Sequence, residues 1–364
     1  MNVHRCIIII SIIVLNCSLS ARQSQENPTD STNGSRSGIY PLPIVFYTPE
    51  TGIAGGAAAL YLYRDQLSPR ASSLTADIIY TQKKQFIAEI SGDQYFEKGR
   101  YRLMTDILFQ KYPDKFFGIG NNTPESGEEP YTPQTLLLKA VLYRNLSSHI
   151  NIGPMVRYEN VSIRETTSGG IIATGVFPGS RDGSSTGVGI VANWDSRDNT
   201  FAAHDGSFYQ LTTMFYRSAF GSDYSYDDVQ IDTRNFFRTF SDHVVAVQAA
   251  GEFIDGLAPF QSYAKFGGQN LLRGYFDGRY RDKNGVLLQA EYRMPVWWRF
   301  GVVGFAGVAQ VTDRISGFAL DRFWFAGGVG LRFAWNLEER INVRIDYGAG
   351  SNSSGIYITI TEAF

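Results

Sequence analysis

The residue with the clearest chemical task in this sequence is Arg273, which stands between glycines in GGQNLLRGY, residues 267–275. Glycine adopts backbone angles that other residues avoid, so Gly267, Gly268 and Gly274 favour a tightly folded loop that approaches other main chains closely. A guanidinium can meet a carboxylate with two parallel hydrogen bonds and can stack on an aromatic ring. At the mouth of a strand-rich barrel, such a loop can place one positive charge deep among the interior side chains.

The sequence does not carry the residue patterns of common enzymes. No HExxH, GxSxG or P-loop motif occurs, and the histidines are scattered. Asp227 and Asp228 are adjacent, and neighbours in a strand point to opposite faces. We therefore expect no enzymatic activity, no cofactor and no metal site. The four histidines are His4, His149, His204 and His243.

One acidic segment, residues 112–132, allows two interpretations. It holds four carboxylates, Asp114, Glu125, Glu128 and Glu129. A calcium site would need them at the regular spacing of a dedicated ion loop, and that spacing is missing. A solvated loop is the interpretation that we favour.

Composition points to a membrane barrel built from strands. The chain has 364 residues with 25 Phe and 21 Tyr, yet only 43% are hydrophobic and the mean hydropathy is −0.16. Beyond the N-terminus no apolar run reaches the roughly 18 residues of a membrane-spanning helix. Rich aromatics with modest hydrophobicity suit a barrel that is apolar outside and polar inside. The net charge of −2 argues against nucleic acid as a partner.

Residues 1–20 have the pattern of a secretory signal peptide. Arg5 precedes an apolar core, and small residues precede a cleavage site before Ala21. A lipoprotein signal acylated at Cys17 is the alternative, although Asn16 is unusual before such a cysteine. The only cysteines, Cys6 and Cys17, lie in this segment, so a mature chain could form no disulfide. Residues 21–38 are polar and read as a disordered periplasmic tether.

From residue 39 to residue 364, period-2 alternation predicts an all-β domain. Sixteen segments alternate, an even number that is typical of a closed antiparallel barrel, and lengths near ten residues fit tilted membrane crossings. Long connections are expected at 112–132, 166–184 and 255–284. The expected strands are 41–48, 53–64, 73–82, 84–95, 100–111, 133–146, 148–163, 185–195, 206–218, 226–239, 242–254, 285–295, 300–311, 323–335, 340–349 and 355–363.

Alternation also predicts which side chains of the strand 285–295 face the interior. Val286, Leu288, Ala290, Tyr292 and Met294 share one face. Leu287, Gln289, Glu291 and Arg293 share the other, which the polar residues mark as the interior face. Glu291 therefore points to where an inward-folded loop could bring Arg273.

Together these features resemble the BamA/TamA outer-membrane β-barrel family, also called the bacterial surface antigen family. The segment Gly267, Gly268, Leu272, Arg273, Gly274, Tyr275 matches the family's plug-loop motif. The segment 194–199, WDSRDN, followed by 205–209, DGSFY, resembles a periplasmic turn of the family that we interpret as structural, because Asp and Asn cap their own turn. The alternating end of the chain, with Tyr357 and the final Phe364, is similar to the family's C-terminal assembly signal. The resemblance implies a sixteen-stranded transmembrane barrel in the outer membrane, with an extracellular loop folded inward as a plug.

The resemblance also implies partners for the plug arginine. In the family this arginine pairs with a glutamate at the position of Glu291. It also meets an aromatic residue and an acid two residues apart on the next strand. Phe305 fills the aromatic position, but Gly307 stands where the acid would be. Asp346, on an inward face of the strand 340–349, is the alternative carboxylate.

The function implied by the resemblance is assistance in inserting or translocating protein or lipid at the outer membrane. The implied partners are the lipid bilayer, outer-membrane client proteins and a separate periplasmic or lipoprotein partner. That partner would replace the periplasmic POTRA domains that family members usually carry, for which residues 21–38 leave no room. The alternative is a passive pore or a structural barrel subunit without assembly activity.

We expect the mature protein to begin at Ala21. N-terminal sequencing of protein extracted from membranes tests this expectation. A start at Met1, or an acylated Cys17, would show that the leader has been misread.

Overall fold

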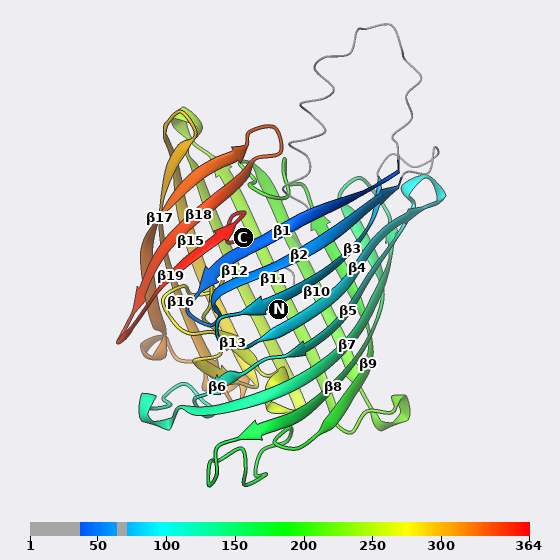
Figure 1. The fold of residues 1–364 in the computed structure, drawn as a ribbon, viewed down its shortest axis with the longest axis vertical. Helices are drawn as coiled ribbons and strands as arrows, with labels where there is room; N and C mark the ends of the chain where they lie inside the picture. The colour runs from blue at the N-terminus through cyan, green and yellow to red at the C-terminus, as the bar shows by residue number, and fades with distance from the viewer. Residues whose placement is uncertain (1–36, 64–70) are drawn as a thin grey trace, which may run out of the picture.

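The computed structural model describes residues 37–63 and 71–364. The expected signal peptide and nearly all of the expected tether lie outside these residues. Within them, sixteen long antiparallel strands follow one another around a single closed ring, each paired with its neighbour in sequence (Figure 1). The fold is all-β, as alternation predicted.

The ring strands are β1 (Gly38–Thr48), β2 (Gly52–Tyr63), β3 (Ser72–Thr81), β4 (Phe86–Phe96), β5 (Tyr101–Lys111), β7 (Glu129–Asn145), β8 (Ile150–Thr166), β9 (Gly183–Asp195), β10 (Gly206–Tyr216), β11 (Ser225–Arg238), β12 (Val244–Leu257), β15 (Asn284–Trp297), β16 (Phe300–Thr312), β17 (Trp324–Asn336), β18 (Ile341–Gly350) and β19 (Ser353–Ile360). Three short strands are β6 (Asp114–Phe116), β13 (Ala264–Phe266) and β14 (Tyr280–Asp282). The 3₁₀ turns are η1 (Glu97–Gly99), η2 (Glu125–Gly127), η3 (Ser218–Phe220), η4 (Phe240–Asp242), η5 (Phe260–Ser262), η6 (Ile315–Gly317) and η7 (Leu320–Arg322). Among the residues described, helical structure is limited to these three-residue turns, and none could span a membrane.

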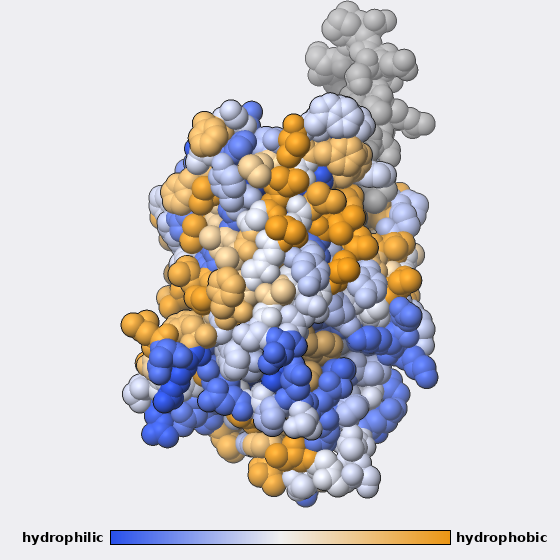
Figure 2. Space-filling model, turned by 90° about the vertical axis from the view of Figure 1, so that its left-hand side faces the viewer, coloured by the Kyte–Doolittle hydropathy of each residue, from blue (hydrophilic) through white to orange (hydrophobic). Residues whose placement is uncertain are grey.

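Alternation along each strand divides the wall into two faces. In β1, Leu42 and Ile44 are 2% and 1% exposed, whereas the neighbouring Val45 is 69% exposed. An apolar residue that is exposed in this way on a barrel suits contact with lipid. Figure 2 shows apolar side chains spread over one side of the outer wall and polar side chains gathered toward one end. The inner and outer faces of β15 are those that alternation predicted, with Glu291 inside and Leu288 outside.

Several expected boundaries were wrong. The acidic segment contains β6, which pairs with β7, and the 255–284 connection contains the hairpin of β13 and β14. The last strand was expected to reach residue 363, but β19 ends at Ile360. Thr361 has a φ of 70°, a left-handed conformation that cannot continue an extended strand.

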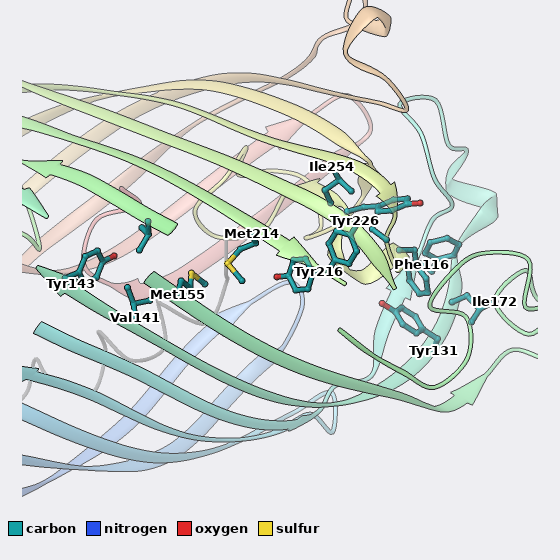
Figure 3. Close-up of a cluster of buried hydrophobic side chains, with 14 residues drawn as sticks. Phe116, Tyr131, Val141, Tyr143, Met155, Ile172, Met214, Tyr216, Tyr226 and Ile254 are labelled. Atoms are coloured by element: carbon teal, nitrogen blue, oxygen red, sulfur yellow. The ribbon is translucent and has the colours of Figure 1, made fainter. Parts of the chain in front are cut away.

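The two mouths of the barrel differ. One, here called the long-loop mouth, carries the connections 112–128, 167–182 and 258–283; the other, the short-turn mouth, carries turns such as 298–299 and 337–340. At the long-loop mouth the three long connections pack together through Phe116, whose ring lies 5.0 Å from that of Phe260 and 6.0 Å from that of Phe177. Figure 3 shows Phe116 and Tyr131 gathered at this mouth, while Met155 and Tyr143 point inward further along the wall.

The ring closes weakly where β1 meets β19. β1 pairs with β2 at every position from Gly38 to Thr48, but with β19 only through Tyr47 and Ile358. We call this the seam. Pro41 and Pro43 lie in the ladder with β2, and a proline in an edge strand places its missing N–H on the outer edge. The seam edge of β1 therefore offers few donors.

This seam predicts uneven hydrogen exchange. Amides of β1 that face the seam, such as that of Val45, should exchange before amides of β11, because β11 has a laddered neighbour on both sides. Exchange in detergent, followed by mass spectrometry or NMR, measures this. Equal protection of β1 and β11 would mean that the seam is closed in solution.

Candidate functional site

The loop 258–283 folds back against the inner faces of β15–β19 and buries Arg273. The Arg273 side chain is 1% exposed, and the main chain of Gly274 donates to the Tyr357 hydroxyl of β19 at 3.1 Å. Leu272 is 2% exposed, and its N–H donates to the Gln289 side chain of β15 at 3.2 Å. The loop is thus attached to both ends of the β15–β19 segment of the wall.

Glycine is required where this loop touches the wall. Gly274 has a φ of 118°, and a Cβ there would lie 2.7 Å from the main-chain nitrogen of Ala349 in β18. On the opposite side, a Cβ on Gly348 would lie 2.6 Å from the Arg273 carbonyl oxygen. Gly267, with a φ of 125°, would clash with the Phe276 carbonyl oxygen at 2.0 Å. The spacing of glycines in the motif therefore follows from main chain lying directly on main chain.

The Arg273 guanidinium lies between two buried carboxylates and one ring. Its two terminal nitrogens donate to Glu291 and to Asp346, whose side chains are both 0% exposed. Its central carbon lies 3.6 Å from the centroid of the Phe305 ring. The structure therefore brings together Arg273, Glu291, Phe305 and Asp346, with Asp346 as the second carboxylate. Gly307 lies opposite Gln289, two residues along β15 from Glu291.

Three further arginines complete the network. Arg293 donates to Glu291 at 2.8 Å, Arg332 donates to Asp346 at 2.5 Å, and Arg344 reaches Asp346 at 3.3 Å. Arg344 also donates to the carbonyl oxygen of Gln269 and to the side chain of Asn270 in the loop. Each of the two carboxylates thus accepts from more than one arginine, so neither buried negative charge is left unpaired.

The tail of the chain, residues 361–364, turns into the barrel and joins the same network. Glu362 accepts from Arg332 at 2.7 Å and from Asn342 at 2.7 Å. The main-chain oxygen of Phe364 accepts from Arg293 at 3.0 Å. The Phe364 ring is 7% exposed and packs with Ala203, Phe236 and Ala246. Four arginines and three carboxylates thus link the loop to the tail.

The other residues expected from the motif also face inward. Tyr275 is 2% exposed; its hydroxyl donates to the Phe325 carbonyl oxygen at 3.0 Å and accepts from the Ser351 N–H at 2.8 Å. The Gly268 N–H donates to the Tyr275 carbonyl oxygen at 2.8 Å and closes the motif on itself. Tyr357 is fully buried against the loop. The assembly-signal role expected for Tyr357 and Phe364 stays a prediction, and both side chains point away from the outer wall.

Sequence reasoning did not assign Arg332, Arg344 or Glu362 to the site. Alternation could have found the two arginines, because Arg332 and Arg344 are directly opposite in β17 and β18. Glu362 could not have been found in this way, since it lies beyond the end of β19. The sequence also did not indicate that glycines of β18 lie against the loop, because glycine is frequent throughout the chain.

A second set of bonds crosses the short-turn mouth. The Asp198 side chain accepts from Arg340 at 2.6 Å, and Asn199 donates to the Glu339 carbonyl oxygen at 3.1 Å. The same two side chains also cap their own turn, Asp198 through the His204 N–H at 2.9 Å. The WDSRDN segment therefore joins the β9–β10 connection to the β17–β18 turn, in line with its structural interpretation.

At the long-loop mouth, Glu50 fastens the loop to the turn between β1 and β2. Its carboxylate accepts from the Asp277 N–H at 3.0 Å. Burial, with a further contribution from the Asp277 carboxylate, raises the pKa of Glu50 from 4.5 to about 7. This contact is therefore sensitive to pH near neutrality.

A closed ring of sixteen antiparallel strands with an apolar outer face and charged residues inside defines an integral outer-membrane β-barrel. The chain belongs to the Omp85 superfamily, whose domain model matches residues 70–364. The expected family resemblance is thereby confirmed. Barrels of this family are transport and assembly proteins and not enzymes.

Solved structures agree on the fold. BamA from Haemophilus ducreyi lacking POTRA domains 1-3 is 14% identical with a TM-score of 0.65, over 94% of this chain and 78% of that one. CdiB from Acinetobacter baumannii is 13% identical with a TM-score of 0.59, over 89% of this chain and 60% of that one. CdiB from Escherichia coli is 10% identical with a TM-score of 0.59, over 90% of this chain and 64% of that one. No curated protein matches the sequence.

We predict that Arg273→Ala destabilises the barrel by less than the ~3–5 kcal/mol of a wholly unpaired buried charge. Glu291 keeps Arg293 and Asp346 keeps Arg332, so neither carboxylate is left alone. A double-mutant cycle with Glu291→Gln, measured by denaturant unfolding in detergent, should give a coupling above about 1 kcal/mol. Arg273→Lys should rescue only in part, because an ammonium cannot bridge both carboxylates as a planar fork does. Additivity of the two substitutions within about 0.5 kcal/mol would contradict the pairing.

A second prediction concerns pH. Because folding raises the pKa of Glu50, the folded state holds an extra proton between pH 4.5 and about 7, and stability should fall as pH rises through that window. Protease cleavage of the loop 258–283 should accordingly be faster at pH 8 than at pH 5. Glu50→Gln should remove this difference. Glu128→Gln, in an exposed ion pair with Lys115, is the matched control and should retain it. A pH profile that is unaffected by Glu50→Gln would refute the assignment.

Proposed function

We propose that this barrel assists the insertion or translocation of protein, or of lipid, at the outer membrane through its seam. The observation that supports this is the single residue pair, Tyr47 with Ile358, that joins β1 to β19. Every other neighbouring pair in the ring is laddered along most of its length. A short closure of this kind costs little to break, because each backbone hydrogen bond contributes only about 1 kcal/mol net.

The unpaired edge of β1 fits a strand-shaped or chain-like client. Gly38 to Phe46 make no ladder on the seam side, and such an edge can pair with an added strand. Pro41 and Pro43 limit this pairing, because they present carbonyl oxygens and no N–H. A client strand would therefore be held mainly by its own N–H groups, which favours transient contact over permanent incorporation.

The arginine network connects the interior loop to this seam. Arg332 contacts both Asp346, the partner of Arg273, and Glu362 in the tail. A movement of the loop 258–283 would thus be transmitted to the tail that follows β19, the strand at the seam. The ion pairs Arg332–Asp346 and Arg332–Glu362 would transmit it. Client proteins and a separate periplasmic or lipoprotein partner are the partners that this mechanism needs.

A structural barrel subunit is the second candidate, and the two prolines favour it. In an edge strand, proline discourages pairing with other chains. The two candidates differ in one property: only an assembly barrel has to open its seam.

Locking the seam distinguishes them. Tyr47→Cys with Ile358→Cys places two thiols at the one paired position of the seam, in a background with Cys6 and Cys17 replaced. Thr213→Cys with Val229→Cys, opposite each other in β10 and β11, is the matched control away from the seam. The barrel is reconstituted in liposomes. A urea-unfolded eight-stranded outer-membrane protein is then added, and its folding is followed by gel mobility; transfer of a labelled lipid between leaflets is measured in parallel.

We expect the parent to accelerate at least one of these two processes, the seam disulfide to abolish the acceleration, and reductant to restore it. The control disulfide should have no effect. Full activity with the seam locked, or no acceleration by the unlocked parent, would contradict the proposal and favour the structural role.

A further inference from the structure

Positive charge gathers on the outer wall at the long-loop mouth, outside the arginine network. Three basic side chains contribute it: Lys84 in the β3–β4 turn, Lys111 at the end of β5 and Arg164 near the end of β8. We call these three residues the basic patch. Lys84 and Arg164 are exposed, and the Lys111 side chain is 45% exposed. One carboxylate, that of Glu165, lies among them and accepts from Lys111 at 3.1 Å.

An irregularity in β8 brings Arg164 to this outer face. The register between β7 and β8 shifts between Thr132 and Pro133, and Arg164 is the residue of β8 that is left without a partner across the ladder. Successive residues of a regular strand point to opposite faces, whereas a β-bulge re-aims a side chain. The side chains of Arg164 and Glu165 are consequently both exposed. The bulge therefore places a guanidinium beside Lys111.

The basic patch lies directly beyond the apolar part of the outer wall. On the outward face of β5, Lys111 follows Ile107 and Phe109, which are 46% and 38% exposed. Phe86 of β4 is opposite Lys111, and its ring lies 6.2 Å from that of Phe109. In membrane barrels, aromatic residues at the edge of the apolar surface mark the membrane interface. The three cations of the patch therefore lie at the depth of lipid headgroups.

The patch holds more positive charge than its own carboxylate can compensate. The Lys84 side chain makes no hydrogen bond or ion pair with the part of the chain that the structure describes, and it acts on Glu165 only over a longer distance. Arg164 donates to the neutral amide of Gln134 at 3.1 Å. Only Lys111 is paired directly with Glu165. Three cations thus share one carboxylate, and two positive charges are left for an anionic ligand.

We propose that the basic patch binds the phosphate groups of a lipid in the outer leaflet of the membrane. Lysine and arginine form charge-assisted hydrogen bonds with phosphate oxygens, and these are stronger than bonds between neutral groups. The long-loop mouth is the external one in the usual arrangement of such barrels, which assigns the lipid to the outer leaflet. The acyl chains would then lie on the exposed apolar side chains of β3, β5 and β7, which are Ile78, Tyr80, Ile107, Phe109, Leu136 and Leu138.

This site is separate from the seam. No residue of the basic patch belongs to β1 or β19, the two strands that meet there. Binding of the lipid therefore does not depend on opening of the barrel, and the inference stands whether or not the barrel assists insertion.

Binding can be measured on the intact barrel in detergent by native mass spectrometry. The probe is lipid A with both of its phosphates, and the comparison lipid is the same molecule with both phosphates removed. Inorganic phosphate is the lipid-free probe. The test variant combines Lys84→Gln, Lys111→Gln and Arg164→Gln. Lys84→Gln alone is a second variant, because its exposed side chain lies in a turn and its loss leaves the strand ladders intact.

The control variant removes the same charge from the same mouth. It combines Lys115→Gln, Lys283→Gln and Arg314→Gln. Each of these side chains already meets an acceptor of the protein: Lys115 meets Glu128 at 2.7 Å, Lys283 the Gly256 carbonyl oxygen at 2.9 Å and Arg314 Asp313 at 2.9 Å. Heat-modifiable mobility on gels verifies that every variant is folded.

We expect the parent and the control variant to bind phosphorylated lipid A at least about tenfold more tightly than the test variant does. Lys84→Gln alone should weaken binding in the same direction, and the lipid without phosphates should bind the parent and the test variant equally. Equal binding of phosphorylated lipid A by the parent and the test variant would overturn the proposal. Equal losses in the test and control variants would overturn it too, because net charge alone would then decide. Inorganic phosphate that binds as tightly as the lipid would show an ion site and not a lipid site.

Discussion

The interior of this barrel depends on the placement of one guanidinium, that of Arg273, between Glu291 and Asp346. Removing such charges from water costs several kcal/mol for each ion, so they are stable inside only when every one is paired. Here Arg293 also pairs with Glu291, and Arg332 also pairs with Asp346. The surrounding geometry follows from this requirement: glycines allow the loop to lie on the wall, and inward-facing strand positions carry the charges.

The same requirement explains the unusual end of the chain. If β19 continued in register from Tyr47 and Ile358, residues of the tail would lie opposite Pro41 and Pro43, which have no N–H to donate. Turned inward, Glu362 instead accepts from Arg332. The tail therefore loses little at the seam and gains charge-assisted hydrogen bonds in the interior, roughly twice as strong as neutral ones. Pro41 and Pro43 thus weaken the seam, and the same prolines leave Glu362 free to join the interior network.

Periodicity was enough to predict sixteen strands and the inward face of β15, whereas the pairing of Arg273 with Glu291 was implied by the family resemblance. Alternation is a local property, and a strand with one face in lipid obeys it throughout. It could not predict the inward tail, because the turn at Thr361 is set by contacts with β17 and β18 that are distant in sequence. The small strands β6, β13 and β14 were missed for the same reason, since their pairing depends on how the long connections pack. Asp346 could be suggested as the second carboxylate because alternation places it on an inward face of its strand. Only the structure shows that it accepts a hydrogen bond from Arg273.

The central claim is that one ionic network holds both the loop and the tail. The most direct measurement is the rate at which a water-soluble maleimide labels Ala363→Cys in the folded barrel, where residue 363 is 8% exposed. The account predicts slow labelling in the parent and clearly faster labelling when Arg273→Ala is added, because Arg273 is linked to the tail through Asp346 and Arg332. Labelling that stays slow after Arg273→Ala, in a barrel whose loop has become accessible to protease, would show that loop and tail are held independently and would contradict the account.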